Sequence, residues 1–168
     1  SKLEYKRRKP AMTHLHVLLV DTSSSAIGGN GLATAKGVIR SIAKQTYLQR
    51  ELLCIIHFGN NTVSLIHPPR RPPKFFLPVL NQMTAGGGTP LRKALKYVES
   101  LFKRWDNSQQ YPMRSLYLFT DGRTNDSVSD IHLNAKLTVI DTETTTLRLG
   151  RSEQIAKTLN SHYMHIAH

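Results

Sequence analysis

Short apolar runs alternate with amphipathic segments along this chain, and this alternation limits the folds that it can adopt. Two segments, 32–43 and 90–105, repeat apolar side chains at helical spacing. Runs with the length and composition of buried strands lie at 15–20, 51–58, 113–120 and 137–141. Strands separated by helices predict a mainly parallel sheet with right-handed crossovers and helices on both faces. We therefore predict a doubly wound, Rossmann-like α/β fold.

Turn and proline signals predict the remaining elements. Gly59-Asn60-Asn61 is typical of a hairpin turn, so we expect 62–66 to be the one antiparallel strand of a six-stranded sheet. Residues 67–73 include four prolines, which favour an extended surface loop because proline lacks the backbone donor. Further elements are expected at 74–82 (short helix), 152–159 (helix capped by Ser152) and 163–166 (edge strand).

Length and composition are those of one domain. With 168 residues, of which 39% are hydrophobic, the chain can bury a core without disulfides. We expect this domain to span 13–168 and to follow a basic linker or tail at 1–12. The single cysteine, Cys54, lies in an apolar run and is expected to be a buried thiol. Because a lone cysteine cannot form an internal disulfide, a reducing, cytoplasmic setting is expected. The sequence shows neither a membrane span nor a signal peptide.

A carboxylate and several hydroxyls follow the first predicted strand. In a turning loop, Asp21, Ser23 and Ser25 can direct their oxygens at one point, which suits a small hard cation. Asp and Ser are also favoured at helix N-caps and in turns. This stretch alone therefore leaves both interpretations open.

Two distant stretches favour the cation. Thr89 follows a glycine turn and precedes a predicted helix, whose first turn carries Pro90. Asp121 ends another predicted strand. Ligands of such sheets bind at the carboxyl ends of the strands, so we expect the strands that end at Asp21 and Asp121 to be neighbours.

The ordered set D-x-S-x-S, G-G-x-T-P and T-D-G resembles the metal-ion-dependent adhesion site of von Willebrand factor A (integrin I-type) domains. The resemblance implies that Mg²⁺ or Mn²⁺ is coordinated by Asp21, Ser23, Ser25, Thr89 and Asp121. Ser24 stands where the commoner pattern has glycine, which stiffens the loop but removes no ligand.

Further stretches resemble the C-terminal A-type domain of the D subunits of magnesium chelatase and of related cobalt chelatases. They are Ala35-Lys36-Gly37, Pro68-Pro69-Arg70, 86–91, 120–125, 139–143 and Leu149-Gly150-Arg151. The resemblance implies a non-catalytic module that docks with an AAA+ ATPase subunit and a large chelatase subunit, through an acidic residue on the metal, during metal insertion into a tetrapyrrole. The chain has no G-x-x-x-x-G-K-[ST] loop for ATP phosphates.

The net charge of +12 bears on the partner. Basic side chains that would steer an acidic partner to the ion are Arg70, Arg71, Arg92, Lys93 and Arg123. A merely solvated basic surface is the other interpretation. Nucleic acid is disfavoured because the basic segments lack interleaved aromatic residues, although a domain of an unrelated AAA+ or nucleic-acid-associated complex remains the alternative function. Phosphate ester hydrolysis is a further alternative, but no general base accompanies either aspartate motif.

Two other clusters bear metal-ligating residue types. His14 and His16 share one face of the first strand, but the sequence indicates no third ligand, so a strand edge is favoured over a transition-metal site. Asp126, Asp130 and His132 fit no metal-ligand spacing, and a turn with aspartate caps is the better interpretation.

Overall fold

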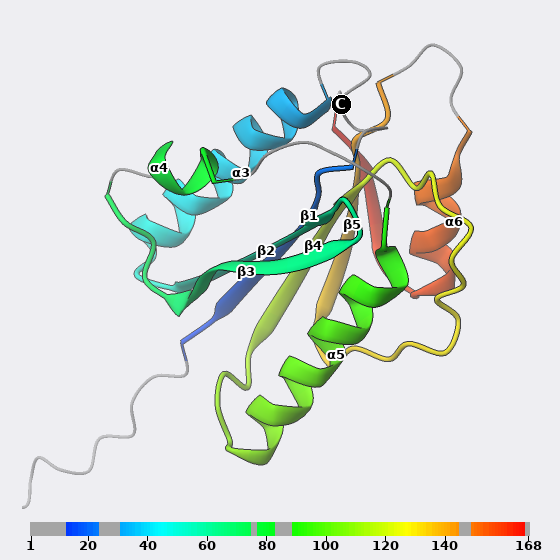
Figure 1. The fold of residues 1–168 in the computed structure, drawn as a ribbon. Helices are drawn as coiled ribbons and strands as arrows, with labels where there is room; N and C mark the ends of the chain where they lie inside the picture. Colours follow the sequence, from blue (N-terminus) through cyan, green and yellow to red (C-terminus); the bar gives the residue numbers. More distant parts are fainter. Residues whose placement is uncertain (1–12, 24–30, 75–76, 83–88, 145–148, 167–168) are drawn as a thin grey trace, which may run out of the picture.

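The computed structural model describes residues 13–23, 31–74, 77–82, 89–144 and 149–166. They form one six-stranded sheet with the strand order β3-β2-β1-β4-β5-β6, flanked by helices (Figure 1). The strands are β1 (Leu15–Asp21), β2 (Leu52–Gly59), β3 (Thr62–Arg70), β4 (Arg114–Thr120), β5 (Lys136–Asp141) and β6 (His162–His165). The helices are α3 (Gly31–Leu48), α4 (Leu77–Leu80), α5 (Leu91–Asn107) and α6 (Arg151–Thr158). The predicted tail at 1–12 lies outside the described residues.

The pairing of the strands confirms the predicted fold class. β1 is parallel to both of its neighbours, β2 and β4, and β5 and β6 continue the parallel part of the sheet. β3 is antiparallel to β2. Asn60 and Asn61 make the turn between them with φ of 48° and 59°, the left-handed region that the short hairpin turn requires.

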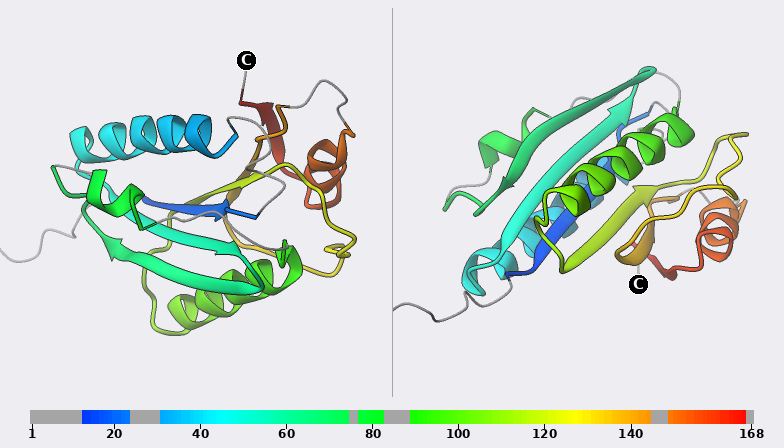
Figure 2. Two further views of the ribbon diagram at one scale, coloured as in Figure 1. Left: turned by 45° about the horizontal axis from the view of Figure 1, so that its top comes forward. Right: turned by 90° about the horizontal axis from the view of Figure 1, so that it is seen from below.

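The apolar side chains of β1 alternate between two cores. Val17 and Leu19 belong to the core beneath α5 and α6, whereas Leu18 and Val20 pack with α3 and α4. Figure 2 shows the sheet between these two helical layers. Burial on both faces explains why β1 reads as a continuous apolar run rather than as an alternation.

Helix α5 has the expected stripe of buried residues at helical spacing. The stripe consists of Leu91, Ala94, Leu95, Val98, Leu101, Phe102 and Trp105. The charged side chains of its opposite face stay in solvent, so burial of the stripe, rather than helix propensity, holds α5 on the sheet. No helix in the described ranges has the length and apolar character that a membrane crossing needs.

A buried guanidinium joins the end of α5 to the start of β4. The Arg114 side chain is 1% exposed and its Nη2 lies 2.6 Å from Asp106 Oδ1. The guanidinium carbon lies 4.9 Å from the ring centroid of Phe102 and 5.8 Å from that of Trp105. The charge is thus shared between one carboxylate and two aromatic faces, which makes its burial tolerable.

Two local predictions were wrong. β3 continues through Pro68 and Pro69 instead of ending in a loop at residue 67. β3 is the outer strand of the sheet, where a missing N–H need not break a ladder, and its pairing with β2 is irregular at this point. Helix α6 is not capped by Ser152 either. Its N-cap is Gly150, at φ 68°, and the Ser152 hydroxyl donates to the Thr120 carbonyl at 2.7 Å.

Candidate metal centre

The carboxyl ends of β1 and β4 meet at one edge of the sheet, which we call the carboxyl edge (Figure 1). Val20 pairs with Phe119, so Asp21 lies opposite Thr120 and next to Asp121. Both aspartates are 2% exposed, and Ser23 is 1% exposed. The expected neighbourhood of the two aspartate-bearing strands is therefore confirmed, and it follows from the crossover that places β4 beside β1.

The carboxylate of Asp21 is held by two donors. Its Oδ1 accepts from the Ser23 backbone N–H at 2.8 Å, and its Oδ2 accepts from the Thr120 hydroxyl at 2.9 Å. The Thr120 oxygen in turn accepts from the Gly122 N–H at 3.0 Å. Thr120 thus links the loops that follow β1 and β4.

The pKa of Asp21 is raised to about 6, mainly by burial and to a smaller extent by the neighbouring Asp121, while the hydrogen bonds from Ser23 and Thr120 oppose this rise. Two carboxylates that are taken out of water and placed side by side favour a cation between them. Their hydroxyl and carboxylate surroundings offer only oxygen donors, the type that Mg²⁺ and Mn²⁺ prefer. The donor set of this edge therefore fits the ion that the sequence motif implies.

The carboxylate of Asp121 faces Arg123. Oδ1 accepts from the Arg123 N–H at 3.0 Å, and Oδ2 lies 3.7 Å from its Nε. The same guanidinium lies 3.3 Å from Glu143 Oε2, on the loop after β5. Arg123 thus bridges two buried carboxylates, at 3% and 1% side-chain exposure, while its own side chain is 35% exposed.

Thr89 is positioned by contacts between the start of α5 and the loop after β4. The Thr124 hydroxyl donates to the Thr89 carbonyl at 3.5 Å, and Asp126 Oδ2 accepts from the Arg92 N–H at 2.9 Å, within the first helical turn. Asp126 thus places a negative charge at the N-terminus of α5, where the positive end of the helix dipole makes that charge favourable. Ser25 and residues 86–88 lie outside the described residues, so the structure places four of the five expected ligands.

The five predicted steering residues fall at different places. Arg92 and Lys93 line a cavity of about 610 Å³ beside Thr89, together with Asn61, Pro90, Lys96 and Asp126. Arg92 is paired with Asp130, at 2.6 Å and 2.7 Å, and this contact holds the pKa of Asp130 well below its usual range. Lys93 Nζ donates to the Asn61 carbonyl at 3.2 Å.

Arg70 and Arg71 lie at the opposite edge of the sheet. Arg70 pairs with Leu53 near the start of β2, whereas Asp21 pairs with Phe58 near its end. Because β3 runs antiparallel to β2, its last residues reach the amino end of the parallel strands. The structure therefore brings Arg92, Lys93 and Arg123 to the carboxyl edge and leaves Arg70 and Arg71 away from it.

Thr120 and Glu143 belong to this site although they were not among the residues predicted for it. The signal available for Thr120 was a hydroxyl directly before the aspartate that ends a strand. Glu143 follows β5, the next strand at the same edge, and its Oε1 also accepts from the Leu149 N–H at 2.9 Å. The Thr120 contact depends on the pairing of β1 with β4, and the Glu143 contact depends on the position of β5 beside β4.

Comparison with known proteins agrees with this geometry. Residues 16–123 match the family described as the von Willebrand factor type A domain. The chain is 27% identical over 128 residues to the magnesium-chelatase 67 kDa subunit of Chlorobaculum tepidum, an alignment that covers 73% of this chain and 20% of that subunit. The chain thus spans about a fifth of the length of that relative.

Solved structures show the same fold. The SpRpn10 VWA domain superposes with a TM-score of 0.68 at 14% identity, covering 91% of this chain and 87% of that one. The manganese-loaded TRAP protein of Plasmodium vivax gives 0.61 at 19% identity, with 92% and 68% covered. The matched family spans most of the chain, from the first strand to the loop after Asp121, and so this protein belongs to the von Willebrand factor type A domain family.

Proposed function

We propose that the domain binds one Mg²⁺ or Mn²⁺ ion at the carboxyl edge and uses it to dock an acidic residue of a protein partner. The ligands would be Asp21, Ser23, Ser25, Thr89 and Asp121. The observation that carries the proposal is the pair of buried aspartates at adjoining strand ends, one of them held by Ser23 and Thr120. A fold relative that is manganese-loaded, the TRAP protein, supports it by analogy.

The donor set suits docking better than hydrolysis. Two carboxylates balance the charge of a dication and hydroxyls complete part of its shell, so coordination positions remain for exchangeable ligands. A bound ion would supply electrostatic attraction for a carboxylate, which grows as the interface excludes water. Among the described residues of the site, Arg123 holds Asp121 and the Arg92 backbone holds Asp126, which leaves neither of these carboxylates poised as a general base.

The proposed parent is a D-type subunit of a cytoplasmic magnesium or cobalt chelatase. The similarity to a magnesium-chelatase subunit supports this assignment. In that role the domain is non-catalytic, and its partners are an AAA+ ATPase subunit and a large chelatase subunit. Lys93 and Arg92 beside Thr89, with Arg123 beside Asp121, provide the cationic surroundings that an acidic docking segment requires.

Calorimetry with Mg²⁺ and Mn²⁺ tests the ion site. The wild-type chain is expected to bind one ion, and Asp21→Asn is expected to abolish binding, because the swap removes charge while keeping the size of the side chain. Ser108→Ala, at the C-cap of α5, removes a hydroxyl at the end of the helix that is far from Thr89 and is the control. Unchanged affinity in Asp21→Asn would refute the site.

Pull-down with the ATPase subunit, in magnesium and in chelator, tests docking. Thr89→Ala and Arg70→Ala form a matched pair, since Arg70 lies at the opposite edge. Thr89→Ala, which removes a ligand of a buried ion, should reduce the binding free energy by roughly 2–5 kcal/mol. Arg70→Ala, which removes an exposed charge, should reduce it by less than about 1 kcal/mol. Full binding in chelator, or equal small losses in both variants, would exclude the ion as the docking point.

A further inference from the structure

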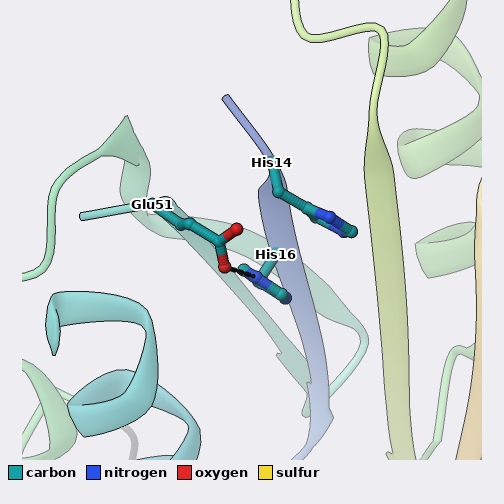
Figure 3. Close-up of side chains that lie close together, drawn as sticks. All are labelled: His14, His16 and Glu51. Atoms are coloured by element: carbon teal, nitrogen blue, oxygen red, sulfur yellow. Dashed lines mark hydrogen bonds and ion pairs between the residues drawn. The ribbon is translucent and has the colours of Figure 1, made fainter. Parts of the chain in front are cut away.

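A second cluster of metal-ligating side chains lies at the amino ends of the strands, on the α3 face of the sheet. It consists of His14, His16 and Glu51, which we call the amino-edge cluster. One ligand atom of each residue lies within 4.8 Å of those of the other two. Figure 3 shows the two imidazoles side by side on the strand and Glu51 reaching toward them from the start of β2.

The strand register brings these three residues together. His14 and His16 are two positions apart, so they share a face, the one that also carries Leu18 and Val20 toward α3. Leu15 pairs with Leu52, which puts Glu51 beside this end of β1. Glu51 Oε1 lies 2.8 Å from His16 Nε2. Glu51 is thus the third ligand, which the local sequence around the histidines did not indicate because it lies 35 positions from His16.

Each imidazole has one ring nitrogen within hydrogen-bond distance of a hydroxyl on β4, which leaves its other nitrogen for a metal ion. His16 Nδ1 lies 3.1 Å from the Tyr117 hydroxyl, and His14 Nε2 lies 2.7 Å from the Ser115 hydroxyl. A ligating histidine commonly uses its other ring nitrogen in this way, which fixes the tautomer and the ring orientation. Ser115 and Tyr117 both come from β4, so a third strand supports the cluster.

The cluster is accessible: the side chains of His16 and Glu51 are 13% and 25% exposed, and a cavity of about 350 Å³ lies between His16, Tyr117 and α3.

The geometry points to a binding site for a divalent transition metal of the Zn²⁺ class at His14, His16 and Glu51. Two imidazoles and one carboxylate suit zinc, whereas Mg²⁺ selects oxygen ligands. Tetrahedral zinc holds its ligand atoms roughly 3.4 Å apart, whereas these ligand atoms lie within 4.8 Å of one another, so the side chains must move closer to bind the ion. The imidazoles are stacked at 4.4 Å and 7°, so one ring must also turn to direct a nitrogen at the ion.

This site is separate from the carboxyl edge. Asp21 lies five positions beyond His16 along β1, which corresponds to roughly 16 Å of extended chain. The inference does not depend on the proposed docking function.

Calorimetric titration of untagged protein with ZnCl₂ tests the inference, with Co²⁺ absorption as a second measurement. We expect one zinc site that excess Mg²⁺ does not displace, and Co²⁺ bands in the visible range. Glu51→Gln removes the carboxylate ligand but keeps a hydrogen-bonding side chain of similar size. His14→Ala removes an imidazole ligand from the residue that precedes β1. Each is expected to weaken Zn²⁺ at least about tenfold, since even outer partners of metal ligands contribute about 10- to 100-fold.

His132→Ala, which removes an exposed imidazole from a distant loop, and Asp21→Asn, at the carboxyl edge, are the matched controls and should leave Zn²⁺ affinity unchanged. Tyr117→Phe should weaken binding less than loss of a ligand. Zinc affinity that is equal in wild type, His14→Ala and Glu51→Gln would overturn the inference, as would absence of binding by the wild-type protein. In either case His16 and Glu51 would serve only as an ion pair that joins β1 to β2.

Discussion

The Thr120 hydroxyl donates one hydrogen bond and accepts another at a position that is 0% exposed. It orients Asp21 without being one of the expected ligands. Its effect on the site is therefore indirect. It sets the direction of the Asp21 oxygens, and it accepts the Gly122 N–H, which fixes the loop that carries Asp121.

Replacing this hydroxyl by a methyl group should affect both stability and ion affinity. Thr120→Val leaves Asp21 Oδ2 and the Gly122 N–H without a partner, so we expect a loss of about 1–3 kcal/mol in the free energy of unfolding. Mg²⁺ affinity should fall as well. Urea denaturation and calorimetry measure the two effects.

Thr142→Val is the matched control. Thr142 is equally buried, at 4%, and its hydroxyl has no hydrogen-bond partner among the described residues. The same substitution there should cost little or even stabilise the fold. Equal losses at both positions would show that the Thr120 hydrogen bonds contribute nothing specific.

The sequence was sufficient to predict individual residues wherever their role is set locally. Cys54 is buried as expected, and burial raises the pKa of its thiol to about 12. The contacts of Thr120, Glu143 and Glu51 depend on which strands are neighbours and in which register. No local pattern contains that information.

At the level of elements, two glycines occupy contrasting environments. Gly37 is exposed in the middle of α3, and a Cβ there would meet nothing within 4 Å. Gly59 ends β2, and a Cβ there would lie 2.8 Å from Thr22 Oγ1 and 3.1 Å from the Ser23 backbone nitrogen. The close approach of β2 to the Ser23 loop thus depends on the absence of a side chain.

Alanine at the two positions should have opposite effects. Gly37→Ala is expected to stabilise the domain by about 0.5–1 kcal/mol, because alanine loses less backbone entropy in a helix. Gly59→Ala is expected to lower the melting temperature and to weaken Mg²⁺ binding by displacing the Ser23 loop. Thermal unfolding of both variants, with calorimetry, gives the comparison. Unaltered ion affinity in Gly59→Ala would contradict the role given to this contact.

Most elements were predictable because each carries its own periodicity. The helix at 90–105 and the strand at 15–20 were found within two residues of their ends. β3 was not, because prolines favour a loop over a strand, whereas an outer strand can include them. The predicted cap of α6 failed for a related reason: the Ser152 hydroxyl bonds to Thr120 of β4, a tertiary partner.

For the molecule as a whole, His67 couples stability to pH. It is 0% exposed, its Nδ1 donates to the Leu53 carbonyl at 2.9 Å, and its Nε2 accepts from Arg70 Nε at 3.4 Å. Burial lowers the pKa of His67 from 6.5, and the Arg70 charge lowers it further. The folded state therefore holds the imidazole neutral.

Acidification should destabilise the domain through this residue. Because the folded pKa is lowered, the unfolded chain binds the proton first, so stability is present above about 6.5 and is lost as the pH falls below it. His67→Gln should flatten the dependence of unfolding free energy on pH between about 7 and 5. Denaturation curves at several pH values test this, and an unchanged slope would assign the dependence to other groups.

The overall arrangement was more predictable than the surface that it creates. Alternation of strands and helices was enough to place Asp21 beside Asp121. It could not place Arg70, because an antiparallel strand carries its last residues back to the far edge of the sheet. Nor could it join His14 to Glu51, which requires the pairing of Leu15 with Leu52.

The position of Trp105 has a practical consequence for experiments on this protein. It is the only tryptophan, and it lies beside the Arg114 guanidinium at the end of α5, some 16 residues and thus roughly 24 Å of helix from Thr89. Its emission is therefore expected to report whether the helix remains docked on the sheet, while ion occupancy at the far end should leave its surroundings unchanged. Fluorescence-detected unfolding with and without magnesium consequently separates a true gain in stability from a direct optical effect of the ion, without any added dye.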